Sequence, residues 1–475
     1  MEEVAITKLV HGGQALGELA DGRKVFVWNA LPGERVRVRI IKKKRSYAEA
    51  IAEEVVLASP ERVEPLEANY LATSPWQIMT FAAENRHKAD IVKELFTQAG
   101  VVIPSEVEES SGEKGDLSTT PAAAGSAQDD KAVLSVGSEL HYRNKMEYSF
   151  WGDDDGLHLA LHRRGSHGKE IVQGSVLALP ALDTAAQAVL SELQRLNVRA
   201  GDLKTVIVRC NQAGEAVAAL FVKPSEFPRL KLPNAVKTPV SKDSPLSALK
   251  GLRVYHSNPR SPASVPTQLL YELGDCGLHD ALLGQTFSYD VDSFFQVNVP
   301  VYTRALESIR VHCQGDPVDM YAGVGTIGLS VAKKQVTLVE LDAATAAMAH
   351  VNAEKSPVDA EVVQTSTEKA LEYITAEQPV IFDPPRAGLH AQVVQRCLEV
   401  LPPQIIYLSC NPSTHARDLA LLQDVYAIKH FEVFIFFPRT PHIETLAVLE
   451  RQTAEDPNRK STAELLPKLC DTIKT

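Results

Sequence analysis

Hydrophobic and polar residues alternate most regularly near the N-terminus. In the segment Arg35–Ile41 basic and apolar residues alternate with period two, which predicts a strand with arginines on one face and valines in a core. Residues 4–10 and 24–28 are further short apolar runs, and the pairs Asp21-Gly22 and Pro32-Gly33 are typical of turns. Evenly spaced short strands of this kind predict a small β-barrel over residues 1–60.

The basic strand of this barrel has two interpretations. Its positive charges continue through residues 42–45 and would suit the phosphate backbone of a nucleic acid. The same charges would also suit a solvated edge strand, where they prevent aggregation. The pattern leaves both interpretations open. Trp28 and Tyr47 are aromatic residues that could stack on bases, although core packing suits Trp28 better.

Between the barrel and residue 286 helical and strand patterns mix. Residues 80–99 predict a helix that stops at Gly100, and residues 206–209 and 216–222 predict paired strands. The segment 104–131 has almost no large apolar residue, so it is predicted to be a disordered insert. We therefore assign residues 61–285 to a mixed α/β central domain.

From residue 286 onward the pattern of strand, glycine loop, helix and strand repeats. This order is typical of a parallel sheet covered by helices, and it predicts a Rossmann-like α/β domain over residues 286–452. Residues 453–475 are polar and are expected to form a tail.

Composition changes this picture only slightly. The net charge of −11 weakly disfavours nucleic acid, but a local basic patch can outweigh an average. No apolar stretch has the length needed to span a bilayer, and residues 1–4 resemble no secretion signal. A cytoplasmic protein without membrane contact is therefore expected.

A candidate cofactor site lies at the start of the C-terminal domain. The segment 317–329 combines a strand end, the glycines Gly323 and Gly325, and a helix start, so that a ligand can approach the backbone. The next strand ends at Glu340, at a distance along the chain that suits the hydroxyls of a ribose. These features fit a dinucleotide and S-adenosylmethionine (SAM) equally well.

Three later segments end buried strands with chemically active residues. Asp383 opens an Asp-Pro-Pro-Arg turn that ends with Arg386, and Cys410 follows the strand of residues 405–409. His442 and Glu444 follow a third apolar run, although a surface ion-pair network would explain them too. A lone cysteine is usually a small buried hydrophobe, but carboxyl ends of strands in this architecture are where substrates bind.

Taken together, these residues resemble the RNA 5-methyluridine methyltransferases over nearly the whole chain. Residues 1–60 resemble the TRAM domain, an oligonucleotide-binding barrel. Five segments follow in the family's order: residues 142–145, 294–298, 383–386, 409–412 and 437–444. The resemblance implies that SAM contacts six residues, namely Gln296, Tyr321, Gly323, Thr326 (where the family often has Asn), Glu340 and Asp383.

The resemblance also implies a mechanism. Cys410 would attack carbon 6 of a uracil as a thiolate, and Glu444 would remove the proton from carbon 5. Arg386 or His442 would steady the thiolate or the enolate oxygen. The target base must be single-stranded or flipped out of a helix. RNA is the expected partner, with ribosomal RNA preferred over transfer RNA, and a monomer is the expected state.

The cysteines set this chain apart from many relatives. Many TRAM-bearing members hold an iron–sulfur cluster, yet the corresponding stretch Leu71–Gln77 has no cysteine, and a fourth family position falls near Gly174. Such a cluster needs four thiolates, so no iron–sulfur cluster and no metal are predicted.

Three alternatives stay open. An enzyme that methylates an exocyclic base amine would need no cysteine, and an RNA-binding protein with a vestigial catalytic domain would not bind SAM. A nicotinamide dehydrogenase would leave Gln296, Cys410 and Glu444 without a role.

Overall fold

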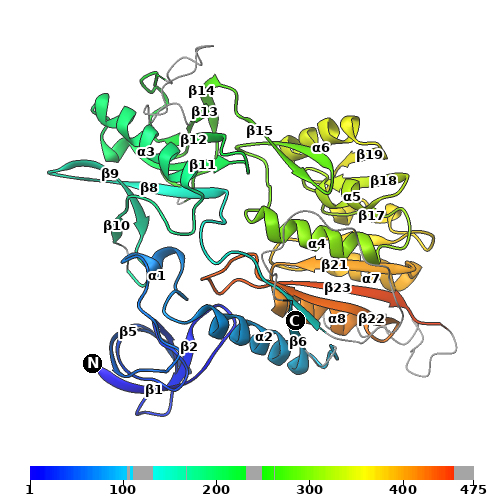
Figure 1. Cartoon of the computed structure of the whole chain (residues 1–475), viewed down its shortest axis with the longest axis horizontal. Coiled ribbons are helices and arrows are strands. Elements are labelled where there is room, and N and C mark those ends of the chain that lie inside the picture. The colour runs from blue at the N-terminus through cyan, green and yellow to red at the C-terminus, as the bar shows by residue number, and fades with distance from the viewer. Residues whose placement is uncertain (104–106, 111–131, 167, 232–248, 262, 454–475) are drawn as a thin grey trace.

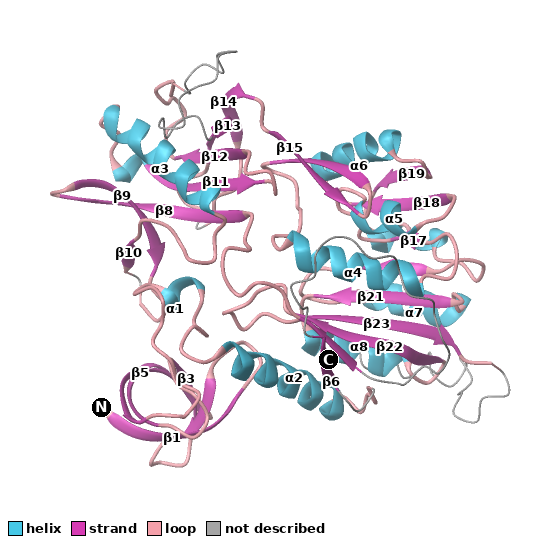
Figure 2. Cartoon of the chain, in the orientation of Figure 1, coloured by secondary structure: helices cyan, strands magenta, loops and turns pink. Residues whose placement is uncertain are grey.

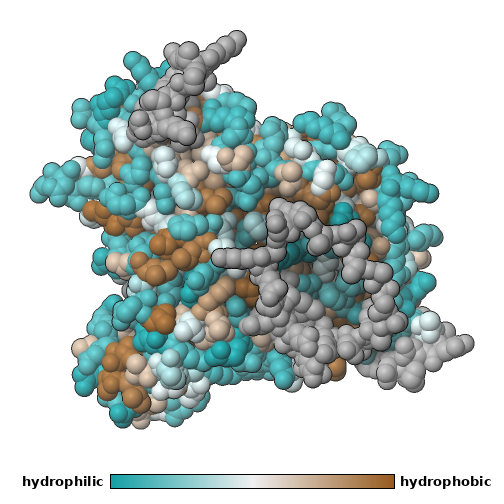
Figure 3. All heavy atoms as spheres, in the orientation of Figure 1, coloured by the Kyte–Doolittle hydropathy of each residue, from teal (hydrophilic) through white to brown (hydrophobic). Residues whose placement is uncertain are grey.

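The chain folds into an N-terminal barrel, a central sheet and a C-terminal α/β domain (Figure 1). The computed structural model describes residues 1–103, 107–110, 132–166, 168–231, 249–261 and 263–453. The predicted tail beyond residue 453 lies outside the described residues, as does most of the predicted insert. Polar residues cover most of the face shown in Figure 3, and apolar residues gather between the barrel and the central sheet.

The barrel closes in the strand order β1-β2-β3-β5-β4. Its strands are β1 (Glu2–Leu9), β2 (Ala15–Glu18), β3 (Lys24–Trp28), β4 (Arg35–Lys43) and β5 (Tyr47–Leu57). Along β4 the valines are buried and the arginines at 35, 37 and 39 are exposed, which confirms the predicted alternation. Closure of the sheet leaves the valines in a sealed core and the arginines on the outer surface.

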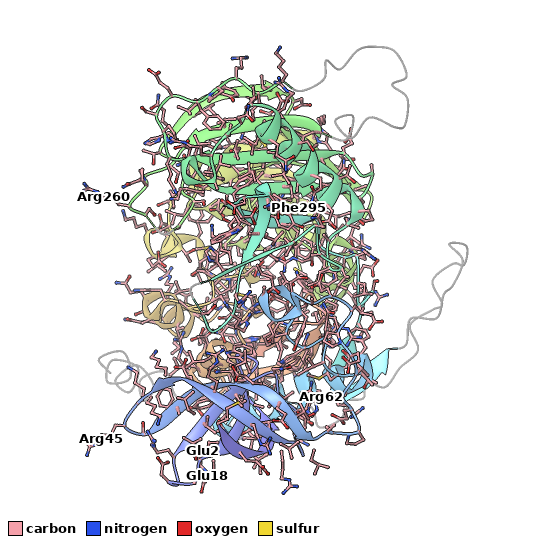
Figure 4. The ribbon with its side chains drawn as sticks, turned by 90° about the vertical axis from the view of Figure 1, so that its left-hand side faces the viewer. Glu2, Glu18, Arg45, Arg62, Arg260 and Phe295 are labelled. Atoms are coloured by element: carbon pink, nitrogen blue, oxygen red, sulfur yellow. The ribbon has the colours of Figure 1, made fainter. Side chains whose placement is uncertain are left out.

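The basic face of β4 is not a bare positive surface. Arg37 pairs with Glu54 at 2.7 Å and Arg39 pairs with Glu53, both on the adjacent strand β5. Further pairs at 3.6 Å join Arg35 to Glu3 and Lys42 to Glu49. Carboxylates therefore compensate part of the charge of β4, and its two interpretations, a phosphate-binding face and a solvated strand, both stay predictions. Arg45, at the turn into β5, projects outward from the barrel (Figure 4).

The central domain is a seven-stranded sheet in the order β10-β9-β8-β11-β12-β13-β14. The strands are β8 (Lys145–Asp153), β9 (Gly156–His162), β10 (Lys169–Ile171), β11 (Leu203–Cys210), β12 (Ala216–Val222), β13 (Leu249–His256) and β14 (Gln268–Gly274). The predicted pairing of β11 with β12 is confirmed and is antiparallel. Helix α3 (Pro180–Arg195) covers one face with its apolar stripe. The hairpin β15 (Gly277–Leu282) and β16 (Gln285–Asp290) leads into the C-terminal domain.

The C-terminal domain is built on a nine-stranded sheet in the order β19-β18-β17-β20-β21-β23-β22-β7-β6. The strands are β17 (Val318–Asp319), β18 (Gln335–Glu340), β19 (Asp359–Gln364), β20 (Val380–Phe382), β21 (Gln404–Ser409), β22 (Tyr426–Phe434) and β23 (Glu444–Arg451). The helices are α4 (Val299–His312), α5 (Thr326–Val331), α6 (Ala343–Lys355), α7 (Ala391–Val400) and α8 (Pro412–Leu422). Figure 2 shows these helices against the strands. The predicted Rossmann-like α/β class is confirmed.

This strand order places a topological switch point inside the sheet. The chain runs outward from β17 to β19 and then returns to β20, on the other side of β17. Ligands of such sheets bind outside the carboxyl ends of the strands at this point. Strands β20 and β21 are buried along their whole length, as expected for parallel strands covered on both faces.

Two segments assigned to the central domain join the C-terminal domain instead. Helix α2 (Phe81–Gln98) packs against α8, because its apolar residues Ile91, Val92 and Phe96 belong to the core of that domain. The strands β6 (Val107–Ser110) and β7 (Ala132–Ser135) extend the sheet beyond β22. Strand β6 corrects part of the predicted insert, since backbone pairing to β7 needs no large apolar side chain. The short helix α1 (Tyr70–Thr73) precedes α2.

Candidate active site

A single cavity opens at the carboxyl ends of β17, β18, β20 and β21. Its volume is about 830 Å³, which suits a cofactor together with part of a substrate. All eight residues predicted for the site line it: Gln296, Tyr321, Gly323, Thr326, Glu340, Asp383, Cys410 and Glu444. Arg386 and His442 line it as well. The structure thus brings together residues spread over about 150 positions of the sequence.

The glycine loop and Glu340 meet at one side of the cavity. Oε2 of Glu340 accepts a hydrogen bond of 2.9 Å from the backbone N–H of Gly323, and Oε1 accepts one of 2.8 Å from Asp342. These two bonds fix the carboxylate at the end of β18 and leave further lone pairs for a ligand. An oriented carboxylate beside a glycine loop is suited to the two hydroxyls of a ribose.

Two aspartates belong to this site: the buried Asp319, and Asp383 in the cavity wall. Asp319 ends β17, and its Oδ2 accepts the N–H of Gly328 at 2.9 Å, while Oδ1 has no hydrogen-bond partner among the described residues. Burial, with the neighbouring Glu340, raises the pKa of Asp319 to about 7. Burial and the nearby Asp319 likewise raise the pKa of Asp383 to about 7, an effect opposed by hydrogen bonding to Gln296. Both carboxyls therefore titrate at a higher pH than an exposed aspartate does.

Cys410 sits at the tip of the loop between β21 and α8. The next residue, Asn411, caps α8 and donates from Nδ2 to the carbonyl of Arg386 at 2.8 Å, which ties this loop to the Asp-Pro-Pro-Arg turn. Burial raises the pKa of the Cys410 thiol to about 12, and the carboxyls of Glu444 and Asp383 add to this effect while Arg386 opposes it. In the free protein Cys410 is therefore a neutral thiol.

Glu444 begins β23 inside the cavity wall and is 3% exposed. Burial and the nearby Asp383 raise its pKa well above the usual range, and its Oε2 has no hydrogen-bond partner in the described part of the chain. Two residues earlier, His442 accepts a hydrogen bond of 3.2 Å at Nδ1 from the guanidinium of Arg386. Burial and the positive charge of Arg386 lower the pKa of His442 to about 4, so the ring is neutral.

Helix α2 holds the loop that carries His442. Nζ of Lys88 donates to the carbonyl of Phe437 at 3.1 Å, and Oε1 of Glu84 accepts the backbone N–H of Arg439 at 2.8 Å. Lys88 and Glu84 also form an ion pair of 2.8 Å with both side chains fully buried. Across the loop, the hydroxyl of Tyr142 donates to the carbonyl of Pro438 at 2.9 Å. The approach to Glu444 is thus fixed from two domains.

Several residues that the sequence did not single out also line the cavity. Arg143 stacks over the ring of Phe437 at 6.0 Å, and Phe294 is 61% exposed in the cavity wall. Both residues belong to segments of the family resemblance, residues 142–145 and 294–298, so the sequence could have indicated them as site residues. Tyr302 on α4 and Thr367 lie in segments that carry no motif, and only the fold brings them to the site.

The stretch aligned with the family's cluster cysteines forms a polar network. The carboxylate of Glu67 accepts from Ser74 and Gln77 at 3.1 Å each, and from the backbone N–H of Val176 at 3.0 Å. This network joins the region of α1 to the central domain where Gly174 also lies. The prediction that no iron–sulfur cluster is present stays a prediction.

The two aromatic residues named for stacking have partners within the protein. One face of Trp28 is covered by the guanidinium of Arg164, 4.1 Å from the ring centre. Tyr47 packs edge-on against Phe26, with ring centres 5.7 Å apart. Trp28 is half-buried and lies outside the hydrophobic core, so core packing is not confirmed for it, and the guanidinium of Arg164 covers one face of its ring.

Comparison with known families identifies this arrangement. Residues 281–452 match the family model described as tRNA (Uracil-5-)-methyltransferase, and residues 1–52 match that of the TRAM domain. The C-terminal domain of the chain is therefore similar to the RNA uracil-C5 methyltransferases, and its barrel is similar to the TRAM domain. The enzymes of this family are SAM-dependent, so the predicted enzyme class and cofactor are confirmed.

Curated relatives match the chain along nearly its whole length. An uncharacterized RNA methyltransferase of Lactiplantibacillus plantarum is 27% identical, with 95% of this chain and 97% of the relative covered. One from Lactobacillus johnsonii is 29% identical, with 94% and 98% covered. A Pyrococcus abyssi tRNA (uracil-54, C5)-methyltransferase, solved with S-adenosyl-L-homocysteine, has the same fold at a TM-score of 0.68 and 20% identity, with 94% of this chain and 100% of that chain covered.

No described helix is both long and apolar enough to cross a bilayer. Within the described ranges, no group of three or more His, Cys, Asp or Glu side chains is arranged to hold a metal ion.

Proposed function

We propose that this enzyme methylates carbon 5 of a specific uridine in RNA through a covalent bond between Cys410 and carbon 6 of the base. The observation that carries this proposal is the placement of a cysteine and a buried carboxyl, Glu444, in the wall of the same cavity that presents the glycine loop and Glu340. A nucleophile, a proton acceptor and a nucleoside-binding edge are the parts that the reaction needs.

The cavity fits SAM on its own chemistry. Glu340, held by the N–H of Gly323, would bind the ribose, while Gln296 and Asp383 lie on the side towards Cys410. Tyr321 and Thr326 would complete the walls. When bound, SAM supplies an electrophilic methyl group on a sulfonium centre, whose positive charge would favour the ionised forms of nearby acids.

Cys410 starts the chemistry that this chain performs. Carbon 5 of uracil is a weak nucleophile, so electrons must first enter the ring. The Cys410 thiolate adds to carbon 6, which breaks the double bond between carbons 5 and 6 and leaves an enolate with carbanion character at carbon 5. Arg386, whose charge favours the Cys410 thiolate, is placed to stabilise this negative charge.

Glu444 completes the cycle. Once carbon 5 carries both a methyl group and its original proton, the Glu444 carboxylate accepts that proton. The electron pair of the C–H bond restores the ring double bond, and the sulfur of Cys410 leaves carbon 6. A positioned general base of this kind contributes about 10²–10⁴-fold in rate. The buried position of Glu444 keeps water from competing for the adduct.

The RNA substrate would reach this cavity with its base turned out of the stack. Ring atoms of a stacked uracil are inaccessible, so the enzyme must act on a single-stranded or flipped nucleotide. We propose ribosomal RNA as the preferred substrate, with the TRAM barrel holding flanking RNA and the enzyme acting as a monomer in the cytoplasm.

Trapping of the adduct tests the mechanism. With RNA that contains 5-fluorouridine, the wild-type enzyme should methylate the base and remain bound to it in a denaturing gel, because fluorine cannot leave as a proton. Cys410→Ala should form no adduct and methylate nothing. Glu444→Gln should accumulate the adduct on ordinary uridine. Cys397→Ala is the matched control, because Cys397 is buried outside the cavity.

Two outcomes would contradict the proposal. Methyl transfer by Cys410→Ala would favour an enzyme acting on an exocyclic amine, which needs no thiolate. Absence of SAM binding in calorimetry would favour an RNA-binding protein with a vestigial site. Mass spectrometry of 5-methyluridine in RNA from a deletion strain identifies the substrate, and loss from transfer RNA alone would overturn the ribosomal preference.

A further inference from the structure

The turn between β1 and β2 of the barrel reaches the loop that leads to Glu444. A Cβ atom added at Gly13 would lie 2.5 Å from Cβ of Pro441, so the backbone of Gly13 is in direct contact with this proline. The carbonyl of Gly13 also accepts a hydrogen bond of 3.0 Å from Nε1 of the buried Trp76. Gly13 is therefore clamped between Trp76 and the residue that precedes His442.

The same turn reaches the loop of Cys410. The His11 side chain lies near Asn411, the neighbour of Cys410, and near Arg386, and its buried Nδ1 has no hydrogen-bond partner in the described part of the chain. Asn411 in turn donates to the carbonyl of Arg386 at 2.8 Å and caps helix α8. His11 thus lies beside the residue that fixes the nucleophile's loop.

We propose that His11 and Gly13 of the barrel are positioning residues for the methylation reaction. Gly13 sets the place of Pro441 and hence of the segment that enters Glu444, and His11 sets the place of Asn411 beside Cys410. This inference rests on the proposed function of those two groups. It implies that the barrel, which otherwise would serve to bind RNA, takes part in the rate of the chemical step.

The chain supplies a matched pair of variants for the test. Gly12 and Gly13 both have left-handed backbones, with φ of +94° and +96°. An alanine at either position is strained to a similar degree. At Gly12 the new Cβ meets nothing within 4 Å, whereas at Gly13 it meets Pro441. The difference in kcat between Gly13→Ala and Gly12→Ala therefore reports the effect of the contact with Pro441.

Steady-state methylation of RNA by the full-length enzyme measures this difference. Displacing reacting groups by on the order of 1 Å can cost roughly 100-fold in rate. We expect Gly13→Ala to lower kcat at least about tenfold relative to Gly12→Ala, with the same KM for RNA and the same Kd for SAM. Equal kcat values for the two variants, or a change confined to KM, would overturn the proposal.

His11 is tested by conservative rescue. His11→Asn keeps a hydrogen-bonding side chain near Asn411, whereas His11→Ala removes it. We expect adduct formation on 5-fluorouridine RNA to slow in His11→Ala and to recover in part in His11→Asn, with SAM affinity unchanged. Equal adduct rates for wild type and His11→Ala would remove His11 from the proposal.

Failure of the proposed function has a different signature. It would appear as methylation by Cys410→Ala, or as the absence of an adduct with the wild-type enzyme. The kcat values of Gly13→Ala and Gly12→Ala are measured by methyl incorporation, which does not depend on a covalent adduct. Their comparison therefore tests the role of the β1–β2 turn whether or not the covalent mechanism is correct.

Discussion

The buried ion pair on α2 allows a sharp test of how the catalytic loop is held. Lys88 and Glu84 are both fully buried, 2.8 Å apart, and each also binds the backbone of the loop, at Phe437 and Arg439 respectively. Replacing Lys88 with Met keeps the volume of the side chain but removes the charge and the donor. The carboxylate of Glu84 is then left in the core without its closest cation.

The magnitude follows from what is left unpaired. Removing one partner of a buried ion pair costs about 3–5 kcal/mol in the free energy of unfolding, because the remaining charge stays desolvated. In the double variant Glu84→Gln/Lys88→Met neither member of the pair is charged, and the Gln carbonyl can still accept the N–H of Arg439. The carbonyl of Phe437 loses the Lys88 donor but keeps its hydrogen bond of 2.7 Å from Oγ1 of Thr440, so the cost is that of one hydrogen bond, about 0.5–1.5 kcal/mol. The double variant should therefore be more stable than Lys88→Met alone.

Urea unfolding followed by circular dichroism measures these free energies for the wild type, both single variants and the double variant. The pH adds a second criterion. Burial raises the pKa of Glu84, so in Lys88→Met the folded state favours the neutral acid, whereas the unfolded chain ionises above the ordinary pKa of a glutamate. Folding must then take up a proton, which costs more as the pH rises towards the pKa of the folded state. The deficit of Lys88→Met should therefore grow from pH 6 to pH 8. A double variant no more stable than Lys88→Met would refute this reasoning.

Three further predictions concern the cofactor pocket and the polar network of Glu67. SAM should bind more tightly as the pH rises through about 7, because the ionised carboxylate of Asp383 attracts the sulfonium. Calorimetry should show that the Kd for SAM depends less on pH in Asp383→Asn than in the wild type, and an equal pH dependence in both would contradict this. Glu340→Ala should weaken SAM binding about 10–100-fold, because a hydrogen bond to a charged group contributes about 1.5–3 kcal/mol to binding. Glu340→Asp should retain part of the affinity in the same assay. Glu67→Ala should lower the free energy of unfolding in urea by about 1–3 kcal/mol, because Ser74, Gln77 and the N–H of Val176 lose an acceptor; no loss would show that water replaces it.

The site was predictable because its parts share one local signature. Glu340, Asp383 and Cys410 each follow a buried apolar run, and parallel strands that cross over through helices bring their carboxyl ends to one edge. Residues that follow such strands in the sequence therefore lie close together in the fold. The alternation along β4 was equally informative, since a period of two fixes which side chains enter the barrel core.

Contacts between distant segments were not predictable in this way. Glu84 and Lys88 stand four positions apart on a helix, a spacing that usually indicates an exposed ion pair. Their burial depends on a loop about 350 residues later, which no local pattern encodes. The ion pairs of β4 with Glu53 and Glu54 were not predictable for a related reason, because they depend on the pairing of β4 with the neighbouring strand.

The charges of the resting site indicate why its chemistry needs the cofactor. The Cys410 thiol is neutral because of burial and the two carboxyls beside it, and burial together with Asp383 raises the pKa of Glu444 well above the usual range. His442 is neutral as well, which leaves Arg386 as the cation that favours a thiolate. A neutral thiol is a poor nucleophile and resists oxidation. The positive charge of a bound methyl donor would favour the ionised forms of both Glu444 and Cys410. We therefore infer that binding of the cofactor activates the nucleophile and the base at the same time.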